Sequence, residues 1–162
     1  MLKTNNKIWR IKRLLALFFL TLIIILVYSN SFKASWHLDD RPNIINNRGL
    51  HINNLQPGSL IRTFFTSPDS GGTITDRLYR PIPCLTFAIN WYLGQDRVFG
   101  YHVVNLLVHI LTAYFLFLTI FNILKSPNLR NPYQGKEHFV AFLTAVLWAI
   151  IPVQVQAVTY IV

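Results

Sequence analysis

The residues best suited to chemistry are two adjacent aspartates, Asp39 and Asp40, in a chain with only six acidic residues. Paired carboxylates can act as a general base that takes a proton from a hydroxyl. They can also bind a divalent cation through oxygen ligands. The structural alternative is a solvated Asp-Asp-Arg-Pro turn in which one carboxylate caps a helix. Spacing alone favours the turn.

Tyr79 and Arg80 directly precede an uncharged apolar block that starts at Pro81. A guanidinium at this position can hold a lipid phosphate through two parallel hydrogen bonds. It can equally anchor the chain at a membrane interface, with its aliphatic stem along apolar surface. Both interpretations of Arg80 stay open at this point.

His102, Asn105 and His109 are three and four residues apart, so on a helix they share one face. Ionisable side chains within an apolar helix indicate either a functional site or hydrogen bonds between helices. Two histidines without a third ligand are weak evidence for a metal. The single cysteine, Cys84, excludes an internal disulfide and is expected to be a buried, inert thiol.

Long uncharged segments must position these residues. The chain is 52% hydrophobic and only 13% charged, about half the usual charged share, which argues against a soluble globule and against disorder. Three uncharged segments reach the roughly 20 residues that a membrane-spanning helix needs. They predict an all-α, polytopic membrane helical bundle with transmembrane helices at 14–32, 98–124 and 139–162. Pro152 should kink the last of these, beside Gln154 and Gln156.

Charge distribution predicts the topology. The N-terminal segment 1–13 has five cations and no acids, and the loop 125–138 has three cations and one acid. Both are therefore expected to be cytoplasmic, with the first helix an uncleaved anchor and 33–97 an extracytoplasmic loop. The net charge of +9 is then a topology signal, and nucleic acid is not expected as a partner.

Within the long loop, residues 59–66 place apolar side chains at helical spacing, which predicts a short interfacial helix with Ser59 as its N-cap. Residues 67–78, with Gly71 and Gly72 adjacent, are expected to be flexible. A further helix should begin near Pro81 and pack against the bundle on the outer side, although a re-entrant segment is the alternative.

Four motifs in this order resemble the N-terminal membrane region of the transmembrane and tetratricopeptide-repeat O-mannosyltransferases and their bacterial relatives, which are polytopic glycosyltransferases of the GT-C class. The motifs are WHLDDRPNIINN, YRPIPCLTFAINWYLG, GYHVVNLLVHILTAYFLF and AFLTAVLWAIIPVQVQAVTYIV. The resemblance covers residues 9–162 and implies that the chain is a fragment of a longer protein with helical repeats, inactive alone. The sequence departs from the family at Ile151-Pro152, where family members more often have His-Pro.

The resemblance also implies a reaction: transfer of a sugar from a polyprenyl-phosphate donor to a protein or glycan acceptor, outside the cytoplasm. Asp39 matches the acidic position that serves as catalytic base, and Asp40 is its neighbour. Tyr79 and Arg80 would face the donor phosphate, and His102, with Asn105 and His109 beneath it, would line the substrate site. The implied location is a bacterial inner membrane, with membrane lipid as a partner. The acidic pair is the candidate site for a divalent cation. The alternative is a non-catalytic, membrane-anchored interaction or assembly module.

Overall fold

The computed structural model describes residues 2–37, 39–66, 80–127 and 129–161, with the side chains of 2–8, 130 and 131 left out. Every regular element in these ranges is helical, which confirms the predicted all-α fold. The chain divides into two compact units. Unit 1 contains Met1–Asn30 and Leu106–Val158, and unit 2 contains Ser31–Asn105 and Thr159–Val162.

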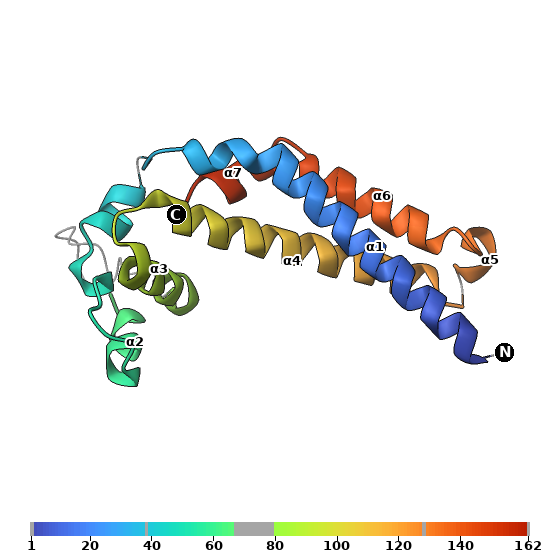
Figure 1. Cartoon of the computed structure of the whole chain (residues 1–162), viewed down its shortest axis with the longest axis horizontal. Helices are drawn as coiled ribbons and strands as arrows, with labels where there is room; N and C mark the ends of the chain where they lie inside the picture. The colour runs from blue at the N-terminus through green and yellow to red at the C-terminus, as the bar shows by residue number, and fades with distance from the viewer. Residues whose placement is uncertain (1, 38, 67–79, 128, 162) are drawn as a thin grey trace. The chain divides into compact units, whose positions relative to one another are not determined.

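Unit 1 is built on three long helices: α1 (Leu2–Tyr28), the larger part of α4 (Val98–Leu124) and α6 (Glu137–Ile150). The short helices α5 (Arg130–Tyr133) and α7 (Gln154–Thr159) complete its elements. α1 and α6 lie side by side (Figure 1). Their buried residues recur at every fourth position, which is the spacing of one helix face. These residues are Leu20, Ile24 and Tyr28 on α1, and Ala141, Ala145 and Ala149 on α6.

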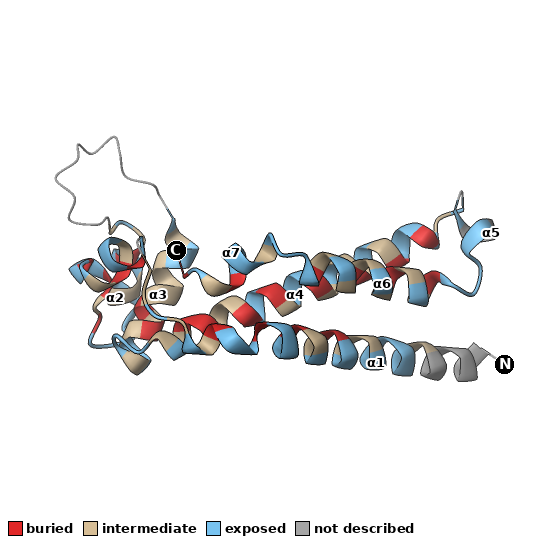
Figure 2. Ribbon diagram, turned by 90° about the horizontal axis from the view of Figure 1, so that it is seen from above, coloured by how far each residue is buried: buried red, intermediate tan, exposed pale blue. Residues whose placement is uncertain are grey.

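Small side chains explain the close approach of α1 and α6. Ala141, Ala145 and Ala149 are fully buried. Alanine at intervals of four residues lets two helix backbones pack closely, as in membrane helix pairs. The opposite side of α1 is exposed along much of its length (Figure 2).

Two helical segments are long and apolar enough to cross a membrane, Trp9–Lys33 and Val98–Leu124. The second has the bounds of the predicted span 98–124, and the first contains the predicted span 14–32. Both present large apolar side chains on their surfaces, among them Leu14, Phe18 and Phe115. Such surfaces are compatible with a membrane protein, while the orientation across the membrane stays a prediction.

The third predicted span is interrupted. α6 ends at Ile150, and α7 begins only at Gln154 after a turn in which the Gln154 N–H donates to the Ile151 carbonyl at 2.9 Å. Pro152 has no N–H to donate to the carbonyl of Trp148, and its ring obstructs a continuing helix. The sequence predicted a kink here, and the helix ends instead.

Unit 2 combines short turns with two helices. It contains η2 (Arg41–Ile45), η3 (Arg48–Leu50), α2 (Pro57–Thr63), α3 (Pro81–Gly94) and the first residues of α4; η1 (Ser29–Lys33) leads into it. α2 packs beside α3 (Figure 1). The predicted helix start at Pro81 is confirmed.

A short helix forms near the predicted position, but its predicted N-cap is wrong. α2 begins at Pro57, with Gln56 as the N-cap residue. Proline at the first helical position has the φ angle that a helix needs, so the helix starts two residues before Ser59. The Ser59 hydroxyl instead donates to Asn54 Oδ1 at 2.7 Å. Leu60 packs against the buried cluster of Leu50, Ile52 and Ala88.

Candidate functional site

The two aspartates of the acidic pair lie in different environments. Asp40 is only 2% exposed, and its Oδ2 accepts a hydrogen bond from the His37 N–H at 2.9 Å. The Asp39 side chain is exposed, and only its backbone carbonyl is held, by the Asn43 side-chain amide at 2.7 Å. Asp40 thus stabilises the turn, while the Asp39 carboxylate can meet a ligand from outside.

The backbone after the pair forms a π turn, η2, in which the Asn46 N–H donates to the Arg41 carbonyl at 2.8 Å. Pro42 lies within it, where the lack of an N–H costs no helical bond. Single π turns are rare and are often found at functional sites. This turn fixes the direction in which the chain leaves Asp39 and Asp40.

Aromatic contacts anchor the acidic segment on both sides. Before it, the Trp36 indole N–H donates to the Asp96 carbonyl at 3.1 Å, and its ring meets Tyr101 edge-on at 5.1 Å. After it, Ile44 is fully buried with Tyr101 and Ile161. The irregular segment is therefore anchored at both ends.

One side chain connects the acidic segment to the polar stripe of α4. The His37 ring packs on the Tyr160 ring at 5.2 Å, and the Tyr160 carbonyl accepts a hydrogen bond from Asn105 Nδ2 at 2.7 Å. Asp40, whose carboxylate bonds the His37 backbone, and Asn105 are thus linked through two residues. His102, one turn earlier on the helix, is fully buried.

His109 lies in unit 1 and has a different partner. Its Nε2 and the Tyr28 hydroxyl both lie at the Ala149 carbonyl, at 3.0 Å and 2.9 Å. A carbonyl only accepts, so Nε2 carries the proton and donates. Ala149 is in the last turn of α6, where carbonyls have no helical partner because the helix ends before Pro152. His109 and Tyr28 therefore cap this helix end.

Arg80 is exposed at the start of α3, and Tyr79 lies outside the described residues. Within the described part of the chain, no hydrogen bond or ion pair joins Arg80 to Asp39. The guanidinium lies near Cys84, a half-buried thiol. Burial raises the pKa of Cys84, against smaller lowering effects of a hydrogen bond with Thr66 and of the Arg80 charge. This supports an unreactive thiol.

A groove of about 400 Å³ lies between the second half of α3 and the start of α4. Its lining is mostly apolar, with one cation and one amide. The lining residues are Asn90, Leu93, Gly94, Arg97, Phe99, Gly100, Val103 and Val104. Arg97 directly follows Asp96, whose carbonyl binds Trp36, so the groove and the acidic segment share an anchor.

The described residues contain no group of three or more His, Cys, Asp or Glu side chains that could hold a metal ion. The suggestion of a divalent cation at Asp39 and Asp40 therefore lacks further ligands among these residues.

The chain is similar in sequence to several protein O-mannosyl-transferases. The chain is 30% identical over 145 residues to the protein O-mannosyl-transferase TMTC4 of Homo sapiens, covering 86% of this chain and 19% of that protein. It is 29% identical over 142 residues to human TMTC1. It is also 29% identical over 162 residues to F38B6.6 of Caenorhabditis elegans, which is again named a protein O-mannosyl-transferase.

The chain is homologous to the TMTC protein O-mannosyl-transferases. It spans about a fifth or less of the length of these relatives. No protein-family model and no solved structure matches the chain. The resemblance that the sequence motifs suggested is therefore confirmed at the level of curated TMTC relatives.

Several side chains at this site were not singled out from the sequence. They are His37, His51, Asn90 and Arg97. The His51 ring stacks on Trp91 at 3.5 Å, and its Nε2 donates to the Ile44 carbonyl at 3.1 Å. A histidine in an Asn-rich loop carries no periodic signal, so only the fold could reveal these contacts.

Proposed function

We propose that the chain forms part of a GT-C type glycosyltransferase that transfers a sugar from a polyprenyl-phosphate donor to a hydroxyl of a protein or glycan. Homology to the TMTC protein O-mannosyl-transferases supports the reaction class. The observation that carries the proposal is the contrast within the acidic pair: Asp39 is exposed on a segment anchored at both ends, while Asp40 is buried. On this proposal the site faces away from the cytoplasm of a bacterial cell.

Asp39 acts as the general base. Its carboxylate accepts the proton of the acceptor hydroxyl, whose oxygen bonds to the anomeric carbon of the sugar. The bond from that carbon to the phosphate oxygen breaks, and polyprenyl phosphate leaves with the electron pair. Asp40 positions the base, because its bond to the His37 N–H fixes the turn.

The groove between α3 and α4 suits the first part of a prenyl chain. Leu93, Phe99 and Val103 supply apolar surface, and Arg97 supplies a cation for the phosphate. Arg80 is the second candidate for that phosphate, as the sequence motif implies. His102 and Asn105, on the following turns of α4, line the substrate site on this side.

The test measures sugar transfer from polyprenyl-phosphate mannose to a protein acceptor, in membranes that contain the complete protein. Asp39→Asn should lower the rate by about 10²–10⁴-fold, since that is the usual contribution of a general base. Helix content and membrane insertion should not change, because the carboxylate is exposed.

Asp96→Asn is the matched control, because Asp96 is an exposed aspartate of the same unit whose only described bond uses its backbone carbonyl. It should retain nearly full activity. Wild-type transfer by Asp39→Asn would overturn the assignment of the base and favour the interaction-module alternative. Arg97→Gln and Arg80→Gln separate the two phosphate candidates, since the true contact should raise KM for the donor most.

A further inference from the structure

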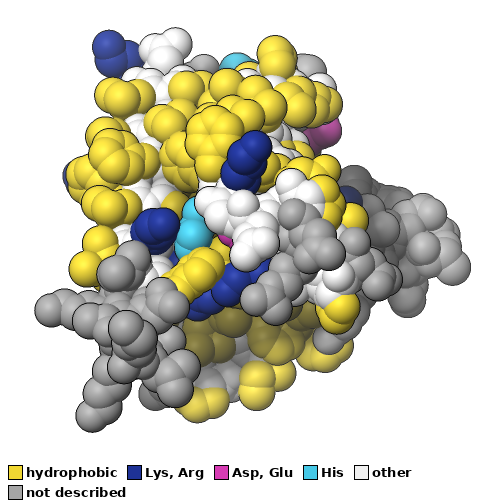
Figure 3. Space-filling model, turned by 90° about the vertical axis from the view of Figure 1, so that its right-hand side faces the viewer, with side chains coloured by type: hydrophobic (Ala, Val, Ile, Leu, Met, Phe, Trp, Pro, Cys, Tyr) yellow, Lys and Arg dark blue, Asp and Glu magenta, His cyan; other side chains and the backbone are white. Residues whose placement is uncertain are grey.

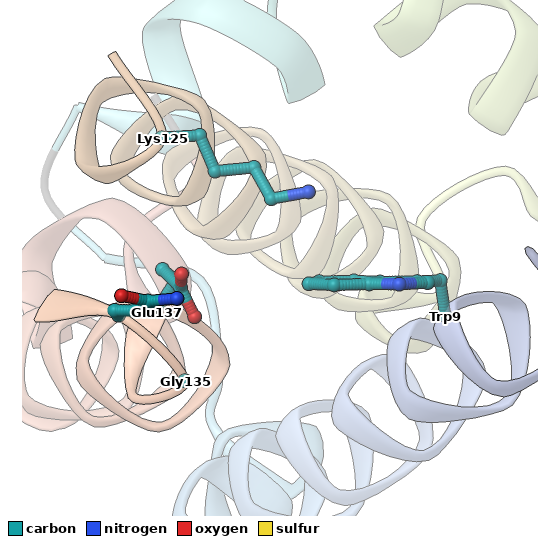
Figure 4. Close-up of a pocket in the computed structure, with 5 residues that line it drawn as sticks. Trp9, Lys125, Gly135 and Glu137 are labelled. Atoms are coloured by element: carbon teal, nitrogen blue, oxygen red, sulfur yellow. The ribbon is translucent and has the colours of Figure 1, made fainter. Parts of the chain in front are cut away.

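A second pocket lies in unit 1, where α1, the end of α4 and the start of α6 meet (Figure 4). Its volume is about 440 Å³. It is lined by Trp9, Lys125, Gln134, Gly135 and Glu137. None of these residues belongs to the proposed sugar-transfer site in unit 2.

Cations in and beside this pocket rest on aromatic rings. The Lys125 ammonium lies 3.8 Å from the centre of the Trp9 ring and 4.6 Å from that of Phe121. The Arg13 guanidinium lies 5.2 Å from the Phe121 ring centre. Rings stabilise cations through their faces but leave N–H donors unused. Within the described residues, neither the Lys125 ammonium nor the Arg13 guanidinium donates a hydrogen bond to an oxygen; the one Lys125 bond is from its backbone N–H to the Asn122 carbonyl.

The single carboxylate nearby is already bonded. Glu137 accepts hydrogen bonds from its own N–H and that of Gly135, and these bonds, with the Lys125 charge, lower its pKa despite burial. In Figure 4 the Glu137 carboxylate lies beside Gly135, apart from the Lys125 ammonium over Trp9. Its one negative charge is outnumbered by the three Lys and Arg charges that act on the neighbouring His138.

The third cation is Lys12. The charges of Lys12, Lys125 and Arg13 all affect the pKa of His138. Burial, followed by the charges of Lys12, Lys125 and Arg13, lowers the pKa of His138, and the Glu137 charge only partly offsets them. His138 is therefore neutral near pH 7 and adds no charge. Among the described residues, the pocket and its border therefore carry more positive than negative charge.

Exposed apolar surface borders these cations. Ile11, Leu14 and Leu15 are exposed on the next turns of α1, and Phe139 is 68% exposed on α6. Figure 3 shows Lys and Arg side chains gathered next to a histidine on this face, with hydrophobic side chains around them. An anion that fits here would carry apolar chains with it.

We propose that this pocket binds the phosphate of an anionic phospholipid, with Lys125 and Arg13 on the phosphate and the acyl chains along the exposed face of α1. Tryptophan and basic side chains at the end of a membrane-length helix suit the headgroup level. Free phosphate has the same negative charge, but it would leave the exposed apolar side chains beside the pocket uncovered. The proposal requires insertion of α1 and α4 into a membrane and is independent of the sugar-transfer site.

Native mass spectrometry of the full chain in detergent can measure the binding of phosphatidylglycerol and phosphatidylcholine with identical acyl chains. Phosphatidylglycerol should bind more tightly. Lys125→Gln and Arg13→Gln should each weaken it by about fivefold, since a cation at the membrane surface contributes about 1 kcal/mol. Lys125→Arg should keep the affinity because the charge remains.

Lys33→Gln is the control, because it removes one exposed cation from unit 2. Circular dichroism shows that each variant is folded, and Lys125→Arg and Arg13→Gln keep the test valid if Lys125→Gln unfolds. Equal binding of the two lipids, or an equal loss for Lys33→Gln, would overturn the proposal. Displacement of phosphatidylglycerol by about 10 mM inorganic phosphate would also overturn it, by identifying a free-phosphate site.

Discussion

The two units use polar side chains in opposite ways. In unit 1, His109 and Tyr28 point inward and donate to a single backbone carbonyl, that of Ala149. In unit 2, Asp39 and Arg80 are exposed on irregular backbone. A polar residue in an apolar helix is therefore weak evidence for a reaction site where a nearby helix end needs a donor. A carboxylate on an anchored turn is better evidence.

The units also differ in what holds them together. Unit 1 packs by regular repetition, with an alanine at every fourth position of α6. Unit 2 packs around single aromatic side chains, such as Tyr101 against Trp36 and Ile44. Substitutions in the regular unit should act mainly on stability, and substitutions at exposed residues of unit 2 mainly on activity.

The largest effect on stability is expected for Ala145→Phe. Ala145 is fully buried on α6, and α1 packs against this helix. A phenyl ring would force the two backbones apart, at a cost of about 3 kcal/mol. Thermal unfolding in detergent, followed by circular dichroism, measures the change.

Leu147→Phe is the control for Ala145→Phe, because Leu147 is on the same helix but 53% exposed. It should change the free energy of unfolding by less than about 0.5 kcal/mol. Equal destabilisation by the two substitutions would show that helix propensity, and not close packing, decides the stability of unit 1.

A smaller effect is expected from His109→Phe and Asn105→Leu, which remove the same type of bond from one helix. Each loses a donor to a backbone carbonyl, but the His109 bond is buried and the Asn105 bond is exposed. His109→Phe keeps the ring contacts with Tyr28 and Trp148 and should cost about 1 kcal/mol. Asn105→Leu should cost about half as much, because water can replace the lost donor.

Adding Tyr28→Phe to His109→Phe tests the shared carbonyl. Without either donor, the Ala149 carbonyl is left unsatisfied, which costs about 1–3 kcal/mol more than one lost bond. The double variant should therefore lose more stability than the sum of the single variants. Simple additivity would mean that another donor reaches this helix end.

The sequence was most informative where one physical rule dominated. The length of the uncharged segment predicted α4 over 98–124, and Pro81 predicted the start of α3. Both signals depend only on residues within the segment itself. The end of α6 was less predictable, since Pro152 permits either a kink or a stop. The stop depends on donors, Tyr28 and His109, that come from distant parts of the chain.

The candidate site was predictable by residue type but not by environment. Nothing in the letters Asp-Asp distinguishes Asp39 from Asp40, because both precede the same turn. Their exposure depends on Trp36 and Ile44, whose partners lie more than fifty residues away. Arg97 was missed for the same reason: a groove is formed by two helices and has no sequence pattern of its own.

The smallest expected effect concerns pH and His138, whose ring lies 4.4 Å from that of Phe121 and 4.8 Å from that of Trp9. Its pKa in the folded chain lies below the ordinary 6.5, chiefly through burial and then through the Lys12, Lys125 and Arg13 charges. The unfolded chain therefore binds this proton more readily. The neutral ring's contribution to stability is complete above about pH 6.5 and is lost as the pH falls through the lowered pKa.

His138→Phe keeps an aromatic ring but cannot take up a proton. Between about pH 7.5 and pH 5, the wild type should lose more stability than this variant, by about 0.5 kcal/mol or less because the residue is only partly buried. Other histidines and carboxylates titrate equally in both proteins, so the difference isolates residue 138. Parallel pH profiles would mean that protonated His138 is tolerated among these cations.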